Sequence, residues 1–147
     1  MHGEGLRSCD TQFRQFAARR EFSGVAVTIK CHEDNVLIKA AVAEPGEGRV
    51  LVVDGDGSLH CALVGDNMAQ IAADNDWAGL VVYGAVRDAV ALSSVDIGLK
   101  ALGTNPRRSS KAGQGERDLP ITIGGALFRP GDLVVSDDDG VVVLPRS

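Results

Sequence analysis

Hydrophobic and polar positions in the first third of the chain follow a pattern that predicts strand, helix and strand. Residues 25–31 alternate bulky and polar side chains, which is typical of a half-buried strand. Residues 50–53 are four consecutive aliphatic residues, a pattern typical of a strand covered on both faces. Between these strands, Asp34 is a candidate N-cap for a helix whose apolar positions recur at helical spacing as far as Ala41. The Pro-Gly-Glu-Gly sequence at residues 45–48 ends that helix.

The centre of the chain repeats this order. Residues 62–64 predict a short strand, residues 66–75 a helix, and Leu80–Tyr83 a buried strand that ends at Gly84. The apolar positions expected on the buried face of this helix are Met68, Ile71 and Ala72. The segment therefore predicts a central strand–helix–strand unit with polar residues at the ends of the strands.

The last third of the chain changes character. Glycine, proline, serine and charged residues dominate from Gly103 to Asp118, which predicts a loop or a ragged hairpin. Short strands are expected at residues 121–123, 133–135 and 141–144, because turn-forming sequences separate these apolar runs. The expected fold class is α/β, a mixed core finished by a C-terminal β-meander. With no linker in the sequence, residues 1–147 are expected to form a single domain.

Composition and charge narrow the class of protein. The chain has 147 residues, of which 44% are hydrophobic and 24% charged, as in an ordinary globular domain. The net charge of −5 argues against general nucleic-acid binding, since a protein that neutralises many phosphates is normally basic on its binding face. The three cysteines are widely spaced and odd in number, the segment Met1–Gly5 has no signal-peptide pattern, and no apolar run is long enough to span a bilayer. A cytoplasmic protein without a membrane partner is expected.

Two short segments carry the candidate chemistry. Because Gly65 stands at a helix start, the amides of Asn67 and Met68 lack helical acceptors and present the positive end of the helix dipole, which binds carboxylate or phosphate. Arg87 and Asp88 follow a buried strand directly. Arginine grips a carboxylate at two points, and aspartate is a hard oxygen ligand of the kind that Mg²⁺ or Mn²⁺ prefers. Together these residues predict a site for a small 2-oxo acid.

Purely structural roles for the same residues stay open at this stage. Asp66 is also a candidate cap for its helix, and Arg87 with Asp88 is also a candidate surface ion pair after a strand.

Other segments predict structural roles more than chemistry. The pairs Cys31–His32 and His60–Cys61 lack the spacing of a zinc site, since neighbours on a strand point to opposite faces. The basic residues Arg107, Arg108 and Lys111 are expected in a solvated loop, and residues 137–139 in a hairpin turn rather than a calcium site.

The chain resembles the RraA-like family, which includes the regulator of ribonuclease activity A and the 4-hydroxy-4-methyl-2-oxoglutarate aldolases. The resemblance covers nearly the whole chain from about Ser8. The segments that carry it are VVDG (52–55), ALVGD (62–66), WAGLVVYGAVRD (77–88), DIGLKALGTNP (96–106), FRPGD (128–132) and DDDGV (137–141). This resemblance implies a compact β/β/α sandwich of the swivelling-domain type that assembles as a ring-shaped homotrimer, with its sites between subunits.

The resemblance also implies a role for each residue of the site. In the family's aldolases, twenty positions separate an acidic residue from an Arg-Asp pair, and the same number separates Asp66 from Arg87. By this similarity, the turn formed by Gly65, Asp66, Asn67 and Met68 would bind the pyruvate-like carboxylate through backbone amides. Arg87 would bind the same keto acid, Asp88 would ligate a divalent metal cation, Mg²⁺ or Mn²⁺, and Asp66 would hold a metal-bound water.

Two activities follow as alternatives. The first is a divalent-metal-dependent lyase that cleaves 4-hydroxy-4-methyl-2-oxoglutarate to pyruvate and decarboxylates oxaloacetate through a pyruvate enolate. The second is a non-catalytic regulator that binds and inhibits ribonuclease E. A menaquinone methyltransferase, a name also used in the family, is not expected, because no glycine-rich nucleotide-binding turn between a strand and a helix is present.

The chain departs from the aldolase pattern at two places. The aldolases usually carry another acidic residue three positions after the metal-binding aspartate, where this chain has Ala91. They also use a carboxylate from a C-terminal segment of the neighbouring subunit, whereas this sequence ends at Ser147, soon after its last predicted strand. A weaker metal site or a different substrate is the expected consequence.

Overall fold

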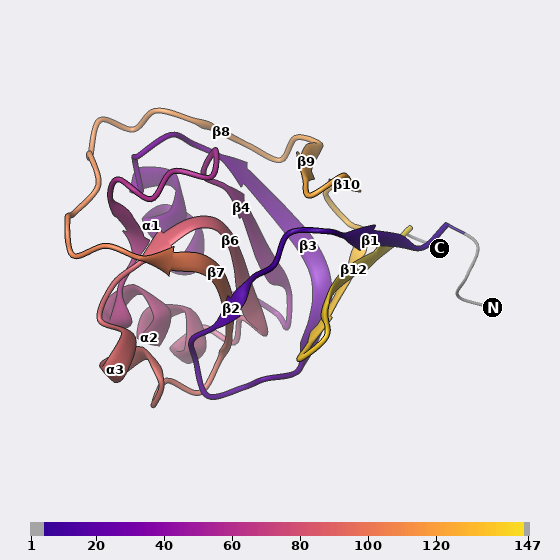
Figure 1. The fold of residues 1–147 in the computed structure, drawn as a ribbon, viewed down its shortest axis with the longest axis horizontal. Coiled ribbons are helices and arrows are strands. Elements are labelled where there is room, and N and C mark those ends of the chain that lie inside the picture. The colour runs from indigo at the N-terminus through magenta and orange to yellow at the C-terminus, as the bar shows by residue number, and fades with distance from the viewer. Residues whose placement is uncertain (1–4, 146–147) are drawn as a thin grey trace.

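The computed structural model describes residues 5–145 and contains one long mixed sheet with helices on one side, as Figure 1 shows. In chain order the elements are β1 (Arg7–Cys9), β2 (Arg14–Gln15), β3 (Phe22–Lys30), α1 (Val36–Val42), β4 (Val50–Asp54), β5 (Ala62–Val64), α2 (Asp66–Asp74), β6 (Gly79–Val86), α3 (Ala89–Leu92), β7 (Gly98–Thr104), β8 (Glu116–Arg117), β9 (Ile121–Ile123), β10 (Ala126–Phe128), β11 (Leu133–Asp137) and β12 (Gly140–Leu144). The predicted α/β class is confirmed. The expectations about Met1–Glu4 and about the chain end at Ser147 concern residues outside the described range.

Strand β3 joins the two parts of the sheet. Its first half pairs with β11 in antiparallel fashion, with Val25 opposite Leu133, and its second half pairs with β4 in parallel, with Ala26 opposite Val50. The strand order is β1-β12-β11-β3-β4-β6-β7-β2, with β5 added beside β6 and β8 beside β3. The parallel strands β3, β4, β6 and β7 form the centre, so their carboxyl ends lie at one edge.

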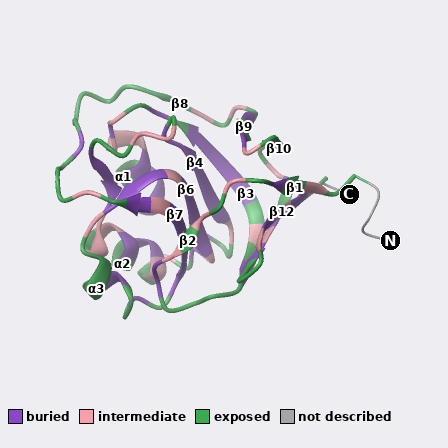
Figure 2. Cartoon of the chain, in the orientation of Figure 1, coloured by how far each residue is buried: buried purple, intermediate pink, exposed green. Residues whose placement is uncertain are grey.

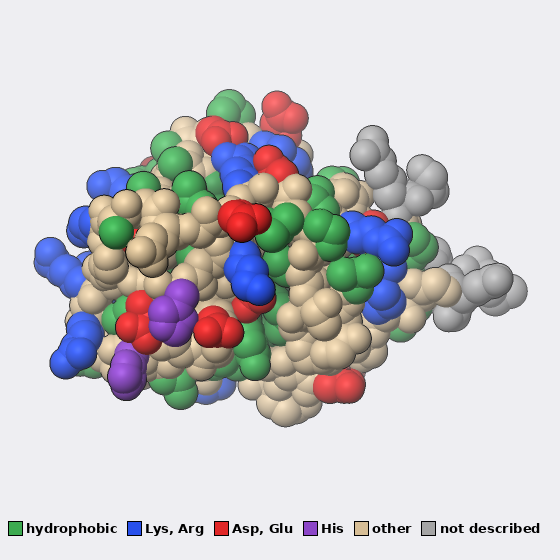
Figure 3. All heavy atoms as spheres, turned by 90° about the horizontal axis from the view of Figure 1, so that it is seen from above, with side chains coloured by type: hydrophobic (Ala, Val, Ile, Leu, Met, Phe, Trp, Pro, Cys, Tyr) green, Lys and Arg blue, Asp and Glu red, His purple; other side chains and the backbone are tan. Residues whose placement is uncertain are grey.

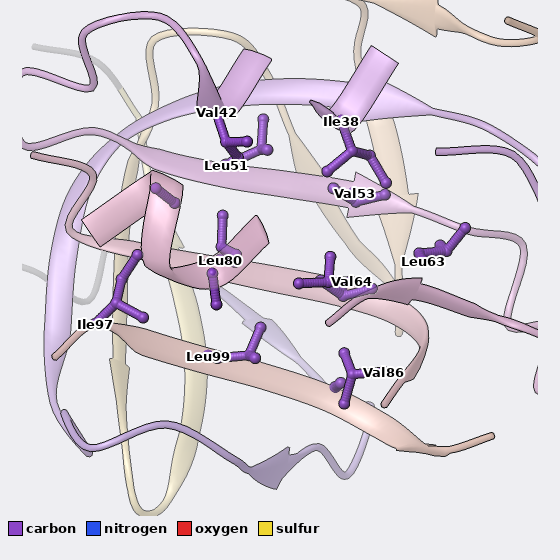
Figure 4. Packing of buried hydrophobic residues seen from close by; sticks show 14 of the residues in the cluster. Ile38, Val42, Leu51, Val53, Leu63, Val64, Leu80, Val86, Ile97 and Leu99 are labelled. Atoms are coloured by element: carbon purple, nitrogen blue, oxygen red, sulfur yellow. The ribbon is translucent and has the colours of Figure 1, made fainter. Parts of the chain in front are cut away.

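Helices α1 and α2 cover one face of the parallel strands. Ile38 and Val42 of α1 extend toward Leu51 and Val53 of β4 in Figure 4, and all four side chains are fully buried. Burial of one such aliphatic side chain contributes roughly 1.5–3 kcal/mol, which explains how a chain with only 4% aromatic residues forms a stable core.

The opposite face of the parallel strands packs against a β-layer. Val50, Val52 and Val81 contact residues of the β9–β10 hairpin and of the C-terminal strands, including Phe128 and Val134. The resulting order of layers is strand, strand and helix, and Figure 2 shows β4 and β6 almost entirely buried.

Most of the predicted elements are confirmed, including the fully buried strand β4 and the central β5–α2–β6 unit, whose two strands pair in parallel. The C-terminal meander is also confirmed, with Asp138 and Asp139 forming the two-residue turn between β11 and β12. Strand β6 runs to Val86, because its end pairs with β5 and β7, so the predicted end at Gly84 is wrong.

Three other details differ from the sequence predictions. Helix α1 begins at Val36 with Asn35 as N-cap, although the Asp34 carboxylate accepts a hydrogen bond from the Val36 amide at 3.0 Å. Between Gly103 and Asp118 the chain forms a loop, the first of the two predicted alternatives, but the segment also contains the unpredicted strand β8, which pairs with β3. The buried face of α2 consists of Ala69 and Ala72, whereas Met68 and Ile71 border a cavity described below.

Among residues 5–145, no helix combines the length and the apolar character needed to cross a membrane.

Candidate functional site

The two segments singled out from the sequence lie against each other. The Arg87 amide donates a hydrogen bond to the Val64 carbonyl at 3.0 Å, which fixes the end of β6 beside the start of α2. A Cβ atom on Gly65 would lie 2.9 Å from Asp88 Oδ2 and 3.3 Å from Arg87 Nε. Because glycine has no side chain, the helix start and the Arg87–Asp88 pair can approach this closely.

The start of α2 leaves its backbone donors free. Gly65 is the N-cap with φ −119° and ψ −175°, and no side chain of the described residues 5–145 caps the helix. The alternative role of Asp66 as the cap is therefore wrong, since Asp66 is the first residue of the helix itself. The amides of Asn67 and Met68 have no acceptor among residues 5–145, so they are available to an anion.

Arg87 and Asp88 interact only weakly with each other. Arg87 Nη1 lies 3.9 Å from Asp88 Oδ2, and the two side chains are 33% and 37% exposed. A pair at this distance and exposure contributes little to stability. Asp88 has φ +62° and ψ 44°, a left-handed conformation that aspartate and asparagine tolerate better than most residues, and its carbonyl accepts a hydrogen bond from the Leu92 amide at 2.8 Å.

Two cavities meet at Arg87. The first cavity has a volume of about 240 Å³ and is lined by Asn35, Lys39, Ala62, Leu63, Gly65, Asn67, Met68, Ile71, Arg87, Arg108, Ser109 and Lys111. The second cavity has a volume of about 310 Å³ and is lined by Arg87, Asp88, Ala89, Thr104, Asn105 and Pro106. The predicted substrate-binding residues thus share the first cavity, apart from Asp66, which lines neither. The predicted metal ligand Asp88 lies in the second.

The donor set of the second cavity fits a hydrated divalent cation. Among residues 5–145, no group of three or more histidine, cysteine, aspartate or glutamate side chains is arranged to hold a metal ion. Mg²⁺ typically keeps several waters and binds proteins through one or two carboxylates. Asp88, half exposed in a cavity that also contains Thr104 and Asn105, can supply such a carboxylate.

One known protein family matches almost the whole chain. The model of the RraA-like family, described as Aldolase/RraA, matches residues 1–143. The chain belongs to the RraA-like family.

Three solved structures are similar to this chain in both sequence and fold. A protein from Geobacillus kaustophilus HTA426, named S-adenosylmethionine: 2-dimethylmenaquinone methyltransferase, is 41% identical with a TM-score of 0.94, over 98% of this chain and 89% of that one. The RNA-processing inhibitor RraA from Thermus thermophilis is 42% identical with a TM-score of 0.94, over 96% of this chain and 86% of that one. RraAS2 from Streptomyces coelicolor, described as an unusual member of the RNase ES inhibitor RraA protein family, is 32% identical with a TM-score of 0.78, over 95% of this chain and 72% of that one.

The RraA-like chain positions one side of the first cavity through a buried carboxylate. Asp34 accepts hydrogen bonds from the amides of Val36, at the start of α1, and Gly113, in the loop before β8, at 3.0 and 2.9 Å. Burial raises the pKa of Asp34, but hydrogen bonds from the amides of Val36, Gln114, Gly113 and Ala112 together lower it below its ordinary value. Asp34 therefore ties the loop to α1 as a carboxylate.

Sequence analysis missed part of the lining of the first cavity. Lys39 on α1 was not among the predicted residues. Arg108 and Lys111 are exposed in a loop, as predicted, but they also line the cavity. The loop approaches two earlier segments through the bridges Ala62–Arg108 and Asp34–Ser110. The basic character of the loop was the available signal, but its approach to α1 is a tertiary feature.

The two cysteine–histidine pairs lie apart from these cavities. Figure 3 shows the two histidines exposed beside carboxylates: His32 Nδ1 is 3.3 Å from Asp56 Oδ2, and His60 Nδ1 is 3.6 Å from Glu33 Oε2. Cys31 and Cys61 are free and buried, and burial raises the pKa of Cys31 to about 12, which suppresses its thiolate.

Proposed function

We propose that this RraA-like chain is a divalent-metal-dependent lyase, of the class II aldolase and oxaloacetate decarboxylase type. Its substrates would be 4-hydroxy-4-methyl-2-oxoglutarate, cleaved to pyruvate, and oxaloacetate, decarboxylated to pyruvate. The observation that supports this most is the contact of Gly65 with both Arg87 and Asp88, which brings an anion-binding helix start, a guanidinium and a carboxylate within one small region.

The binding roles follow from the side chains and amides. Arg87 pairs with the 2-oxo acid through two parallel N–H donors, because guanidinium and carboxylate are planar and complementary. The free amides of Asn67 and Met68, at the turn formed with Gly65 and Asp66, donate to the same carboxylate. These contacts fix the orientation of the bond that breaks.

Both reactions break the C3–C4 bond, one carbon away from the 2-oxo carbonyl, and leave the electron pair as a pyruvate enolate. Oxaloacetate releases CO₂ as the other product, whereas the hydroxy acid releases a second pyruvate as its 4-hydroxyl group gives up a proton. Asp88 would hold the divalent cation, which when bound supplies Lewis-acid stabilisation of the negative charge that develops on the 2-oxo oxygen. Arg87, which lines both cavities, stabilises the same negative charge on the 2-oxo oxygen. Asp66, in the first turn of α2, orients a water that carries the proton to the enolate carbon.

Ala91 bears on the expected rate. It lies on α3 at the position where the resemblance implies a further acidic residue, and it supplies no ligand oxygen. We therefore expect slow turnover, with decarboxylation easier to detect than aldol cleavage.

The second candidate function is a non-catalytic regulator that binds ribonuclease E and inhibits RNA processing. The relative from Thermus thermophilis, 42% identical over 96% of this chain, is named as an RNA-processing inhibitor. The methyltransferase name of the relative from Geobacillus kaustophilus is not extended to this chain. The turn between β5 and α2 has the single glycine Gly65, short of the glycine-rich turn that a dinucleotide or nucleoside cofactor needs.

We also propose that the protein is a homotrimer in the cytoplasm. Val90, two residues after Asp88, is 89% exposed, and it is the aliphatic side chain that we expect a second copy to cover if the sites lie between subunits. The three free, buried cysteines are typical of a reducing compartment.

The test is an assay of both substrates with Mg²⁺ or Mn²⁺, repeated after chelation, on the wild type and on Asp88→Asn. Asparagine keeps the shape of aspartate and tolerates the left-handed backbone at φ +62°, but its neutral amide binds Mg²⁺ poorly. We expect Asp88→Asn to lose metal-dependent turnover and to keep the far-ultraviolet circular dichroism spectrum of the wild type.

A matched control is Asp76→Asn, which makes the same change of charge at an exposed residue with φ +66° outside both cavities. It should keep full activity. Wild-type rates equal to the metal-only background for both substrates would falsify the lyase proposal. A pull-down with ribonuclease E, unaffected by Asp88→Asn, would then favour the regulator.

A further inference from the structure

Two exposed histidines and two carboxylates form a cluster beyond the ends of β3 and β4 (Figure 3). His32 and Glu33 follow β3, Asp56 follows β4, and His60 precedes β5. Glu33 Oε2 lies 3.5 Å from His32 Nε2 and 3.6 Å from His60 Nδ1. The same oxygen accepts a hydrogen bond from Ser58 Oγ at 2.8 Å. The cluster thus joins segments that are separate in the sequence.

His32 differs from His60 in having a carboxylate at each ring nitrogen. Its Nε2 faces Glu33, and its Nδ1 lies 3.3 Å from Asp56 Oδ2, whereas His60 makes one such contact within residues 5–145. A neutral imidazole has one N–H and one lone pair, so it can donate to one carboxylate and presents a lone pair to the other. A protonated imidazole has an N–H at both nitrogens. Only protonated His32 can therefore donate to both Glu33 and Asp56.

The other titratable groups around this ring leave its two carboxylates dominant. Lys30, at the end of β3, and Glu116, on β8, line the same cavity of about 460 Å³ as His32 and carry opposite charges. Cys31 and Cys61 stay neutral thiols, because burial raises the pKa of both, for Cys31 to about 12. The local charge therefore favours the protonated ring.

The segment that carries Asp56 has neither helix nor strand. Residues 55–61, between β4 and β5, are fixed at their base by the amides of Gly55 and Gly57, which both donate to the Tyr83 carbonyl at 3.0 and 3.1 Å. Asp56 itself is exposed, with φ +62°. A contact from Asp56 to His32 ties the exposed part of this segment to the end of β3.

The same segment contacts the wall of the second cavity. Asn105, which lines that cavity, donates through its Nδ2 to the Leu59 carbonyl at 2.7 Å. A change in how firmly residues 55–61 are held therefore reaches Asn105.

We propose that His32 is a proton-dependent clamp on the wall of the second cavity. When its ring takes up a proton, it ties the 55–61 segment to the end of β3, and when the ring is neutral the segment is released. Imidazole ordinarily titrates near pH 6.5, so the clamp is closed at low pH, and its contribution to stability is lost as the pH rises through this titration. The clamp requires neither the proposed lyase activity nor the proposed regulator role.

A double-mutant cycle in thermal unfolding of the full chain, at pH 6 and at pH 8.5, tests the clamp. The variants are His32→Gln, Asp56→Asn and the two together, and asparagine tolerates the left-handed backbone of residue 56. The control cycle pairs Asp56→Asn with His60→Gln, the same substitution at the neighbouring imidazole, which faces Glu33 instead.

We expect the effects of His32→Gln and Asp56→Asn on Tm to depart from additivity by roughly 1–3 °C at pH 6, the size of one exposed ion pair in a chain of this length. At pH 8.5 the two effects should add. The control cycle should be additive at both pH values. Additive effects in the His32 cycle at pH 6, or a coupling of equal size at both pH values, would overturn the clamp.

Nuclear magnetic resonance of the native chain gives a second readout that does not depend on unfolding. The ring protons of His32 and the side-chain amide of Asn105 should change together with pH, and Asp56→Asn should move both changes to lower pH. An Asn105 amide that does not follow His32, or a His32 titration that Asp56→Asn leaves in place, would also overturn the clamp. Circular dichroism of each variant checks that the fold is kept.

Discussion

Arg87 is the residue on which the proposed chemistry depends most, because it lines both cavities. We expect Arg87→Lys to behave as a severe change, although it keeps the positive charge. Lysine lacks the planar fork, so a two-point grip on the carboxylate becomes a single contact. Loss of one charge-assisted hydrogen bond costs about 1.5–3 kcal/mol, or roughly ten- to a hundredfold in kcat/KM.

Steady-state kinetics with oxaloacetate measures this effect, and Arg107→Lys is the matched control. Arg107 is exposed, lies close in the chain to the cavity residue Arg108, and lines neither cavity. Unchanged kinetics in Arg87→Lys would mean that Arg87 serves only as the weak partner of Asp88 at 3.9 Å.

The residues of the site differ in how far the sequence predicts them. Gly65, Arg87 and Asp88 were recognisable because each stands where a helix begins or a strand ends, and such positions show in the local pattern. Lys39 and Arg108 were not, because they meet only through the hydrogen bonds of Asp34 and the pairing of the loop with Ala62. No spacing along the chain encodes that approach.

Among the elements, the first turn of α2 is the most sensitive to a small change. In Gly65→Ala the added Cβ would lie 2.9 Å from Asp88 Oδ2, a distance at which the carboxylate must move. The backbone at φ −119° accepts alanine, so we expect a fall in activity of about tenfold or more with a loss of stability below about 1 kcal/mol.

The test measures the catalytic activity and the thermal unfolding of Gly65→Ala on the same preparation. The control is Gly103→Ala on β7, where the added Cβ would come no closer than 3.7 Å to a neighbour, an ordinary contact. Equal activity of the two variants would refute the view that the close approach at Gly65 positions Asp88.

The junction of α1 with the loop before β8 predicts a dependence of stability on pH. The pKa of Asp34 is lowered in the folded state from an ordinary value of 3.8, since amide hydrogen bonds outweigh the effect of burial. An acidic group whose pKa is lower in the folded than in the unfolded state stabilises the folded state fully at pH values above the unfolded-state pKa. This stabilisation is lost as the pH falls through the folded-state pKa. Asp34→Asn should therefore lower the free energy of unfolding by about 2 kcal/mol at pH 7.

Urea unfolding between pH 3 and pH 7 measures this difference. The difference in unfolding free energy between wild type and Asp34→Asn should begin to narrow below about pH 4, where Asp34 of the unfolded chain takes up a proton, and should narrow further as the pH falls through the lowered folded-state pKa. Asp76→Asn, at an exposed turn, should follow the wild type throughout. A gap that stays constant over this pH range would show that packing, and not the charge of Asp34, causes the loss.

Elements with a strong local signal were predictable, and elements defined by distant partners were not. Strand β4 is four consecutive aliphatics and an aspartate, all buried, so its pattern is unambiguous. Strands β2 and β8 have two residues each and exist only through pairing with β7 and β3. Of the three positions predicted on the buried face of α2, Ala72 is confirmed. Met68 and Ile71 are not fully buried because they border a cavity, and the small side chain of Ala69 packs in the core beside Ala72.

At the scale of the whole molecule, the proposed assembly depends on what covers the region around Asp88. Three copies of the 15.4 kDa chain give about 46 kDa, which light scattering at micromolar concentration distinguishes from a monomer. If a second copy covers α3, Val90→Asp places a charge in an apolar contact and should shift the mass toward 15.4 kDa. The control is Val25→Asp, which changes an exposed valine of β3 that pairs with Leu133 of β11. This variant should remain a trimer. A trimer lost in Val25→Asp and kept in Val90→Asp would mean that the copies meet through the β-layer, and a wild type of 15.4 kDa would refute the assembly itself.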